Sequence, residues 1–189
     1  MKNIALFASG SGTNVENIIK YFQKCNCNIQ PKIILSNKKD AYVLKRAEMF
    51  NIKSFVFNHS QLNNTNDIID ILNENNIEYI ILAGFLWLIP SNLIKAYPNK
   101  IINIHPALLP KYGGKGMYGD NVHKQIVKNK ETESGITIHF VNEKYDEGNI
   151  IFQAKCNILP TDTADDVANK IHKLEYNHFP KIIERVINK

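Results

Sequence analysis

Arginine is almost absent from this chain: Arg46 and Arg185 are the only two among its 23 basic residues. Proteins that bind nucleic acid usually cluster their cations and use arginine forks to hold phosphates and guanine. Here the lysines are scattered and no run of five basic residues occurs. The net charge of +5 is therefore spread along the chain, and this pattern predicts no nucleic-acid partner. A phosphate site in this chain is expected to rely on backbone N–H groups instead.

Cysteines and long apolar runs are scarce too. Cys25, Cys27 and Cys156 have the spacing of neither a redox CxxC pair nor a usual zinc site, so we expect free thiols without a disulfide. No stretch approaches the ~20 apolar residues of a membrane helix. The apolar run at the N-terminus ends at Ala8 in a Gly/Ser loop, unlike a signal peptide. These absences predict a cytoplasmic protein with no membrane contact.

What is present fits one folded domain. The chain has 189 residues, 44% of them hydrophobic, which is enough to bury a sizeable core. Apolar runs predict strands at 4–8, 32–35, 54–57, 79–83 and 101–104. Helical spacing of apolar residues predicts helices at 14–22, with Asn14 as the cap, and at 41–50, 67–75 and 91–97. This alternation predicts an α/β fold with an open, mostly parallel sheet and flanking helices.

The second half of the chain follows another pattern. Four of the nine glycines lie in residues 113–119, which we expect to be a loop. Apolar runs at 136–141 and 149–153, joined by an acidic turn, predict an antiparallel strand pair. A final helix is expected with Val167, Ile171, Leu174 and His178 on one face, kinked or split by Pro180. No linker or repeat divides the chain, so residues 1–189 are predicted to form a single domain.

The first candidate site is the turn Ser9–Asn14 between the first strand and the first helix. It is not a P-loop, because no Gly-Lys-Ser/Thr follows, and Val15 occupies the third glycine position of the dinucleotide pattern. Two interpretations remain open at this point. The segment is a tight turn without a ligand, or the N–H groups of Gly12, Thr13 and Asn14 cradle a phosphate at a helix N-terminus.

The second candidate site is at the end of the fifth strand. Strand alternation places Asn103 and His105 on the same side, where an amide donor could stabilise an oxyanion while an imidazole moves a proton. Asp146, in the later acidic turn, could orient His105 and raise its pKa. The alternatives are a turn-capping Asn103, a loop His105 and a solvated Asp146. His139 is expected in the core or beside the site. No Cys or His near it has the spacing of metal ligands, so no metal site is predicted.

Three motifs occur in order along the chain: Gly-Ser-Gly-Thr-Asn at 10–14, Asn-Ile-His-Pro-Ala-Leu-Leu-Pro-Lys-Tyr at 103–112, and His-Phe-Val followed by Asp-Glu-Gly within 139–148. Together they resemble the phosphoribosylglycinamide formyltransferases, a folate-dependent family of purine synthesis with a Rossmann-like fold. The resemblance covers essentially the whole chain. It implies transfer of a formyl group from the cosubstrate 10-formyltetrahydrofolate to the amine of glycinamide ribonucleotide, without a metal.

The resemblance also implies roles for individual residues. Asn103, His105 and Asp146 would form the catalytic trio. Gly12, Thr13 and Asn14 would hold the substrate phosphate, with Glu175 near the amine-bearing end. The residues implied to bind folate are Leu86, Trp87, Leu88, Ile89, Asn103, Asn142, Glu143, Lys144, Tyr145 and Asp146. Residues 1–100 would then form the phosphate-binding half, and residues 101–189 the catalytic and folate-binding half. Without the resemblance, Trp87 is equally well explained as an anchoring aromatic, and Glu175 as a surface carboxylate.

Two departures from the family pattern stand out. An arginine that often contacts folate is missing, since the corresponding region reads Gln61-Leu62-Asn63-Asn64. The loop 113–119 is longer than in many relatives, and we hypothesise that it covers the substrate.

Three other functions remain in view. Relatives that formylate methionyl-tRNA carry a second domain that 189 residues are not expected to hold, and formyltetrahydrofolate hydrolases usually carry an extra N-terminal domain. A non-catalytic nucleotide-binding module would use only the first loop. The sequence leaves a homodimer open.

Overall fold

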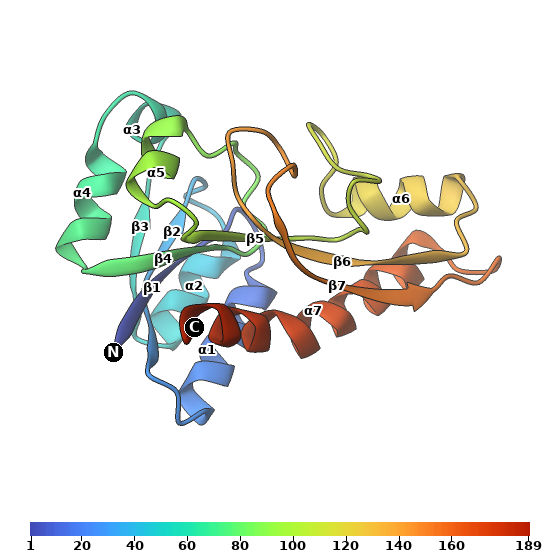
Figure 1. The fold of residues 1–189 in the computed structure, drawn as a ribbon, viewed down its shortest axis with the longest axis horizontal. Coiled ribbons are helices and arrows are strands. Elements are labelled where there is room, and N and C mark those ends of the chain that lie inside the picture. Colours follow the sequence, from blue (N-terminus) through green and yellow to red (C-terminus); the bar gives the residue numbers. More distant parts are fainter.

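Seven strands form one sheet in the order β3-β2-β1-β4-β5-β6-β7 in the computed structural model, which describes residues 1–189 (Figure 1). The parallel strands are β1 (Lys2–Phe7), β2 (Ile29–Ser36), β3 (Lys53–Val56), β4 (Ile77–Leu82) and β5 (Ile101–His105). The antiparallel strands are β6 (Glu133–Phe140) and β7 (Ile150–Asn157). The predicted α/β sheet, mostly parallel with an antiparallel pair in the C-terminal half, is confirmed.

Helices cover both faces of the sheet, which is why its central strands are apolar throughout. In β1, Ile4 and Leu6 join one buried cluster while Ala5 and Phe7 join another, as the two-residue period of a strand requires. The first cluster includes side chains of α1 (Thr13–Lys24), α2 (Tyr42–Met49), α6 (Asp120–Lys128) and α7 (Ala164–Ile187). The second includes α3 (His59–Asn63), α4 (Asp67–Glu74) and α5 (Ser91–Ala96), on the opposite side of the sheet from α1 and α7 (Figure 1).

The strand order reverses direction between β1 and β4, because β2 and β3 extend the sheet on one side and β5 to β7 on the other. Open α/β sheets bind ligands at the carboxyl ends of the strands beside such a point. The loops after β1 and β4 are tied together there: the Ser9 N–H donates to the Gly84 carbonyl at 3.0 Å, and the Leu86 N–H donates to Ser9 Oγ at 3.0 Å. The fold therefore opens a site beside the Gly-rich turn.

Helix α1 begins at Thr13 with Gly12 as its cap, so the prediction that Asn14 caps this helix is wrong. Gly12 has a φ of 71°, a left-handed conformation that favours glycine, and a Cβ at this position would lie 2.5 Å from Val43 Cγ2. Asn14 is free of the capping role, and its side chain bonds another part of the chain instead.

Helix α7 runs unbroken through Pro180, so the predicted split does not occur. A proline cannot donate a hydrogen bond to the carbonyl four residues earlier, which here belongs to Tyr176. The side-chain amide of Asn17, on α1, donates to that carbonyl at 3.0 Å. The polar group that Pro180 leaves unpaired is therefore satisfied by a neighbouring helix.

Two helices were not predicted from the sequence. Helix α3 is a single short turn that begins with a capping box, in which Asn58 Oδ1 accepts from the Gln61 N–H and Gln61 Oε1 accepts from the Asn58 N–H. Helix α6 follows the Gly-rich loop and buries Val122, His123 and Ile126 on one face. Both lie beside stretches rich in turn-forming residues, and these obscure the helical spacing of the apolar residues.

The cysteine prediction is wrong for one pair. Cys25 and Cys27 are joined by a disulfide, because the chain turns after α1 and brings their Cα atoms to 5.2 Å, within disulfide range. Cys156 remains a free thiol and is half-buried. No helix combines the length and the apolar character needed to cross a membrane.

Candidate active site

A cavity of about 990 Å³ lies at the carboxyl ends of β1, β4 and β5. The Gly-rich turn Ser9–Asn14 forms one part of its wall, and residues 103–106 form another. The rest of the lining comes from Lys38, residues 83–86, the loop at 114–119, the start of α6, residues 145–146 and two side chains of α7. Both candidate sites identified in the sequence therefore open into the same space.

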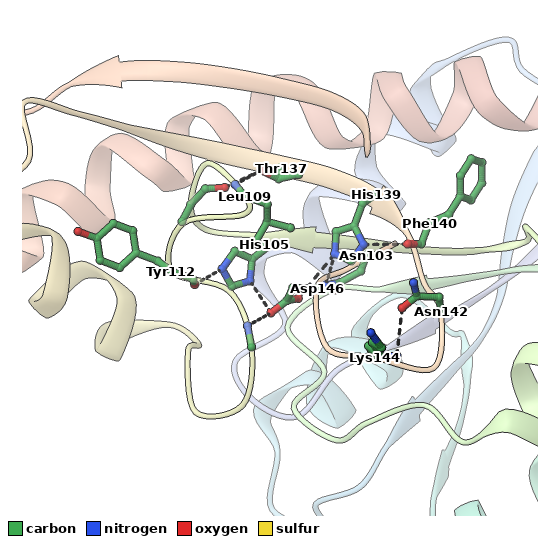
Figure 2. Close-up of polar contacts among 12 residues, drawn as sticks. Asn103, His105, Leu109, Tyr112, Thr137, His139, Phe140, Asn142, Lys144 and Asp146 are labelled. Carbon is green, nitrogen blue, oxygen red and sulfur yellow. Dashed lines mark hydrogen bonds and ion pairs between the residues drawn. The ribbon is translucent and has the colours of Figure 1, made fainter. Parts of the chain in front are cut away.

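Asn103, His105 and Asp146 meet in this cavity (Figure 2). His105 is 4% exposed, and its Nδ1 lies 3.5 Å from Asp146 Oδ2. Asp146 reaches the strand ends from the turn between β6 and β7, and its other oxygen lies 3.7 Å from His139 Nε2. The alternatives of a loop histidine and a solvated turn aspartate do not describe these positions.

His139 links Asn103 to Asp146. Its Nδ1 donates to the Phe140 carbonyl at 2.8 Å, because a carbonyl oxygen only accepts. In the neutral ring, Nε2 is then left to accept from Asn103 Nδ2, which lies 3.0 Å away. One hydrogen of the Asn103 amide is held by this contact, and the second remains for a ligand in the cavity. His139, which the sequence left between core and site, is a neighbour of the site.

The pKa values of His105 and Asp146 differ from those expected from the sequence. Burial lowers the pKa of His105 below its ordinary value, and the opposing effect of Asp146 does not overcome it, so the prediction of a raised pKa is wrong. Burial acts to raise the pKa of Asp146, but the His139 and His105 rings, when protonated, and the Gly114 N–H together hold it below its usual range. The site therefore holds an ionised carboxylate beside a histidine that favours its neutral form.

At the other end of the cavity, the N-terminus of α1 faces Glu175 of α7. Asn14 Nδ2 donates to Glu175 Oε2 at 2.9 Å, and Glu175 is only 6% exposed. Burial raises the pKa of this carboxyl to about 7. Glu175 is buried on α7, so the alternative of a surface carboxylate is wrong, while Leu174 is half-buried and packs against the core as predicted.

Neither of the two arginines, Arg46 and Arg185, lines this cavity. Arg46 Nε donates to the Ser11 carbonyl at 2.8 Å, and the guanidinium pairs with Glu16. Arg46 therefore braces the Gly-rich turn from outside. The cations that line the cavity are the exposed side chains of Lys38, Lys115 and Lys124.

The segments implied to bind folate reach the cavity only in part. Leu86, Tyr145, Asp146 and Asn103 line it. Trp87 packs edge-on against Phe57, His59 and Phe85 outside the cavity lining. Leu88 is 37% exposed, and Ile89 is buried in the core. In the later turn, Asn142 Oδ1 accepts from the Lys144 N–H at 3.0 Å, and Lys144 pairs with Glu147 near Glu143, away from the cavity lining.

Sequence reasoning missed two histidines of this cavity. His123 on α6 is 3% exposed, lines the cavity and has no hydrogen-bond partner for Nδ1. His172 on α7 lines it as well, and burial lowers the pKa of both rings. The signal that could have found His123 is the helical spacing of its neighbours Val122 and Ile126, which the glycines before them obscure.

Known proteins are similar to this chain in sequence and in fold. The family model for formyl transferases matches residues 2–183. The phosphoribosylglycinamide formyltransferase of Bacillus subtilis is 37% identical over 99% of this chain and 95% of its own length. The chloroplastic enzyme of that name from Arabidopsis thaliana is 35% identical over 96% of this chain, which spans 64% of that relative.

Solved structures agree. The phosphoribosylglycinamide formyltransferase of Bacillus halodurans superposes with a TM-score of 0.89 and 30% identity, over 100% of this chain and 96% of that one. The enzyme of that name from Streptococcus pneumoniae gives 0.86 and 30%, over 99% of each chain. Because the family model matches nearly the whole chain and a relative of nearly the same length is 37% identical, the chain belongs to the formyl transferase family.

Proposed function

We propose that this chain transfers the formyl group of 10-formyltetrahydrofolate to the amine of N1-(5-phosphoribosyl)glycinamide, giving the N-formyl product and tetrahydrofolate in de novo purine synthesis. The single observation that carries the proposal is the cavity, which joins the N-terminus of α1 to the cluster of Asn103, His105 and Asp146. Relatives and solved structures that bear the name of this activity support it.

The phosphate of the acceptor binds at the Gly-rich turn in this proposal. The N–H groups of Gly12, Thr13 and Asn14 lie at the N-terminus of α1, where unpaired donors and the helix dipole favour an anion. Lys38 and Lys124 add positive charge to the same cavity. Glu175 then faces the ribonucleotide, with its carboxyl oriented by Asn14.

The chemistry takes place at the end of β5. The neutral amine attacks the formyl carbon, and the free hydrogen of the Asn103 amide donates to the oxyanion that forms on the formyl oxygen. The bond from the formyl carbon to the folate nitrogen breaks, while a proton lost from the attacking amine is carried to that nitrogen with the help of His105. Asp146 stabilises the imidazolium form of His105 during this transfer. The direct attack requires neither a metal nor a covalent intermediate on the protein.

The folate lies between two segments in this proposal, Leu86–Ile89 and residues 142–146. Leu86 and Tyr145 already face the cavity, which supports placing the reactive end of the folate there. Gln61 occupies the region where the family often has an arginine, and its side chain is engaged in the capping box of α3. Contacts of the folate in that region are therefore expected to differ from those of relatives with the arginine.

Release of the folate product, followed by absorbance with and without glycinamide ribonucleotide, tests the proposal. We expect release only when the acceptor is present. Equal release without acceptor, with formate as the product, would identify a hydrolase instead, and tight binding of phosphate ligands without any release would identify a non-catalytic module. A cytoplasmic location, a homodimer and the absence of nucleic-acid and membrane partners stay predictions.

A further inference from the structure

Tyr112 contacts the candidate catalytic histidine through its backbone. Its carbonyl oxygen lies 2.7 Å from His105 Nε2, and because a carbonyl only accepts, that nitrogen carries the proton (Figure 2). In the neutral ring, Nδ1 is then the unprotonated atom, and it faces Asp146 Oδ2 at 3.5 Å. The Tyr112 carbonyl therefore selects which nitrogen of His105 gains and loses a proton beside the carboxylate.

The next two residues hold the carboxylate. The Gly114 N–H donates to Asp146 Oδ2 at 3.0 Å, the same oxygen that faces His105. Gly113 leaves no room for a side chain, because a Cβ would lie 2.7 Å from Leu109 Cδ2 and 3.3 Å from Asp146 Cβ. Residues 112–114, which we call the bracket, thus fix the positions of both His105 and Asp146.

The bracket needs an anchor, since Tyr112 has a φ of 57°, which is unfavourable for a bulky residue. The anchor is its phenol. The hydroxyl donates to Glu131 Oε1 at 2.9 Å and accepts from Asn129 Nδ2 at 2.9 Å, in the segment that follows α6. The hydrogen bond from Tyr112 is the largest influence that holds the pKa of Glu131 below its usual range, in keeping with an ionised acceptor.

We propose that Tyr112 is a positioning residue: its phenol, anchored on Glu131 and Asn129, holds the bracket so that the neutral His105 ring is protonated at Nε2 and titrates at Nδ1 against Asp146. The proposal rests on the role of His105 proposed above. Because the bond to the Tyr112 carbonyl favours the charged ring, losing the anchor lowers the pKa of His105. It also lets the alternative tautomer form, with its proton directed at Asp146.

The variant Tyr112→Phe removes both phenol hydrogen bonds and keeps the ring. We expect kcat to fall about fivefold to tenfold, a fraction of what the two lost hydrogen bonds are worth because Tyr112 acts on the reaction only through His105, with KM for both substrates unchanged. The pKa seen in the pH profile of kcat should fall. The ¹⁵N shifts of the His105 ring, measured without substrates, should change from the Nε2–H tautomer to a mixture.

Matched variants separate positioning from a structural effect. Glu131→Ala should reproduce Tyr112→Phe, the double variant should lose no more than either single one, and Glu131→Gln, which keeps an acceptor oxygen, should restore most of kcat. Lys111→Ala removes the exposed ammonium that contacts Glu131 at 3.2 Å but spares the phenol, and should behave as the unchanged protein.

Two outcomes would overturn the proposal. One is a Tyr112→Phe variant with unchanged kcat, pH profile and ring shifts. The other is a loss of thermal stability and rate with unchanged ring shifts and pH profile, which a merely structural role produces. If the unchanged chain transfers no formyl group, the proposed function fails separately, and the ring shifts still decide whether Tyr112 sets the tautomer of His105.

Discussion

The two ends of the cavity are built in different ways. At the α1 end, the proposed phosphate donors are backbone groups of consecutive residues, Gly12 to Asn14, and their geometry follows from one left-handed glycine at a helix start. At the β5 end, the groups are side chains from a strand, a neighbouring strand and a distant turn. The proposed binding site therefore depends on local backbone geometry, while the proposed chemistry depends on long-range packing.

This difference predicts that single substitutions are most damaging at the β5 end. Asp146→Asn keeps an acceptor for the Gly114 N–H but removes the charge that raises the pKa of His105. We expect the rate to fall between about 10³-fold and 10⁴-fold, as for other carboxylates that orient a catalytic histidine. Steady-state kinetics against pH, with circular dichroism as the folding control, measures this. An unchanged rate across pH would remove Asp146 from the orienting role.

Asn103→Ala is the next largest effect expected. It removes the amide hydrogen proposed for the oxyanion, and turnover should fall on the order of 10²–10³-fold, as for loss of one oxyanion donor. Asn103→Asp, which has nearly the same shape but no N–H, should lose as much. Near-normal turnover in either variant, measured by the same folate-release assay, would contradict the role given to Asn103.

At the α1 end, Glu175→Gln is expected to change how stability depends on pH. Burial raises the pKa of Glu175 from 4.5 to about 7, so between these pH values only the unfolded state ionises and the free energy of unfolding falls as pH rises. Above pH ~7 the free energy of unfolding should be ~3 kcal/mol lower than it is below the pKa of the unfolded state. Denaturation with urea at several pH values should show that Glu175→Gln removes this dependence. A variant with the same pH dependence as the unchanged chain would contradict the burial of this carboxyl.

Gly12→Ala should act through binding of the acceptor. A Cβ there meets Val43 at 2.5 Å and disfavours the φ of 71°. We expect KM for glycinamide ribonucleotide to rise about tenfold, equivalent to ~1.4 kcal/mol, with kcat and KM for the folate nearly unchanged. Gly10→Ala is the matched control, because a Cβ at that glycine has nothing within 4 Å. Equal effects at both glycines would show that the close approach at Gly12 is unimportant.

The same contrast explains how much the sequence could predict. The sheet and most elements could be predicted because apolar runs and turn residues are local signals. Asn103 and His105 could be paired because strand alternation puts them on one side. The burial that sets the pKa of His105 and Glu175 could not be predicted, since it comes from distant segments. The phenol anchor of Tyr112 and the partner of the Tyr176 carbonyl also depend on contacts between elements far apart in the sequence.

The measurement that tests the central claim most directly follows the formyl carbon itself. With the formyl group of 10-formyltetrahydrofolate labelled with ¹³C, NMR should show the label moving onto the amine of glycinamide ribonucleotide, at a rate that Asn103→Ala reduces. Label that appears as free formate, or stays on the folate when the acceptor is present, would contradict the account.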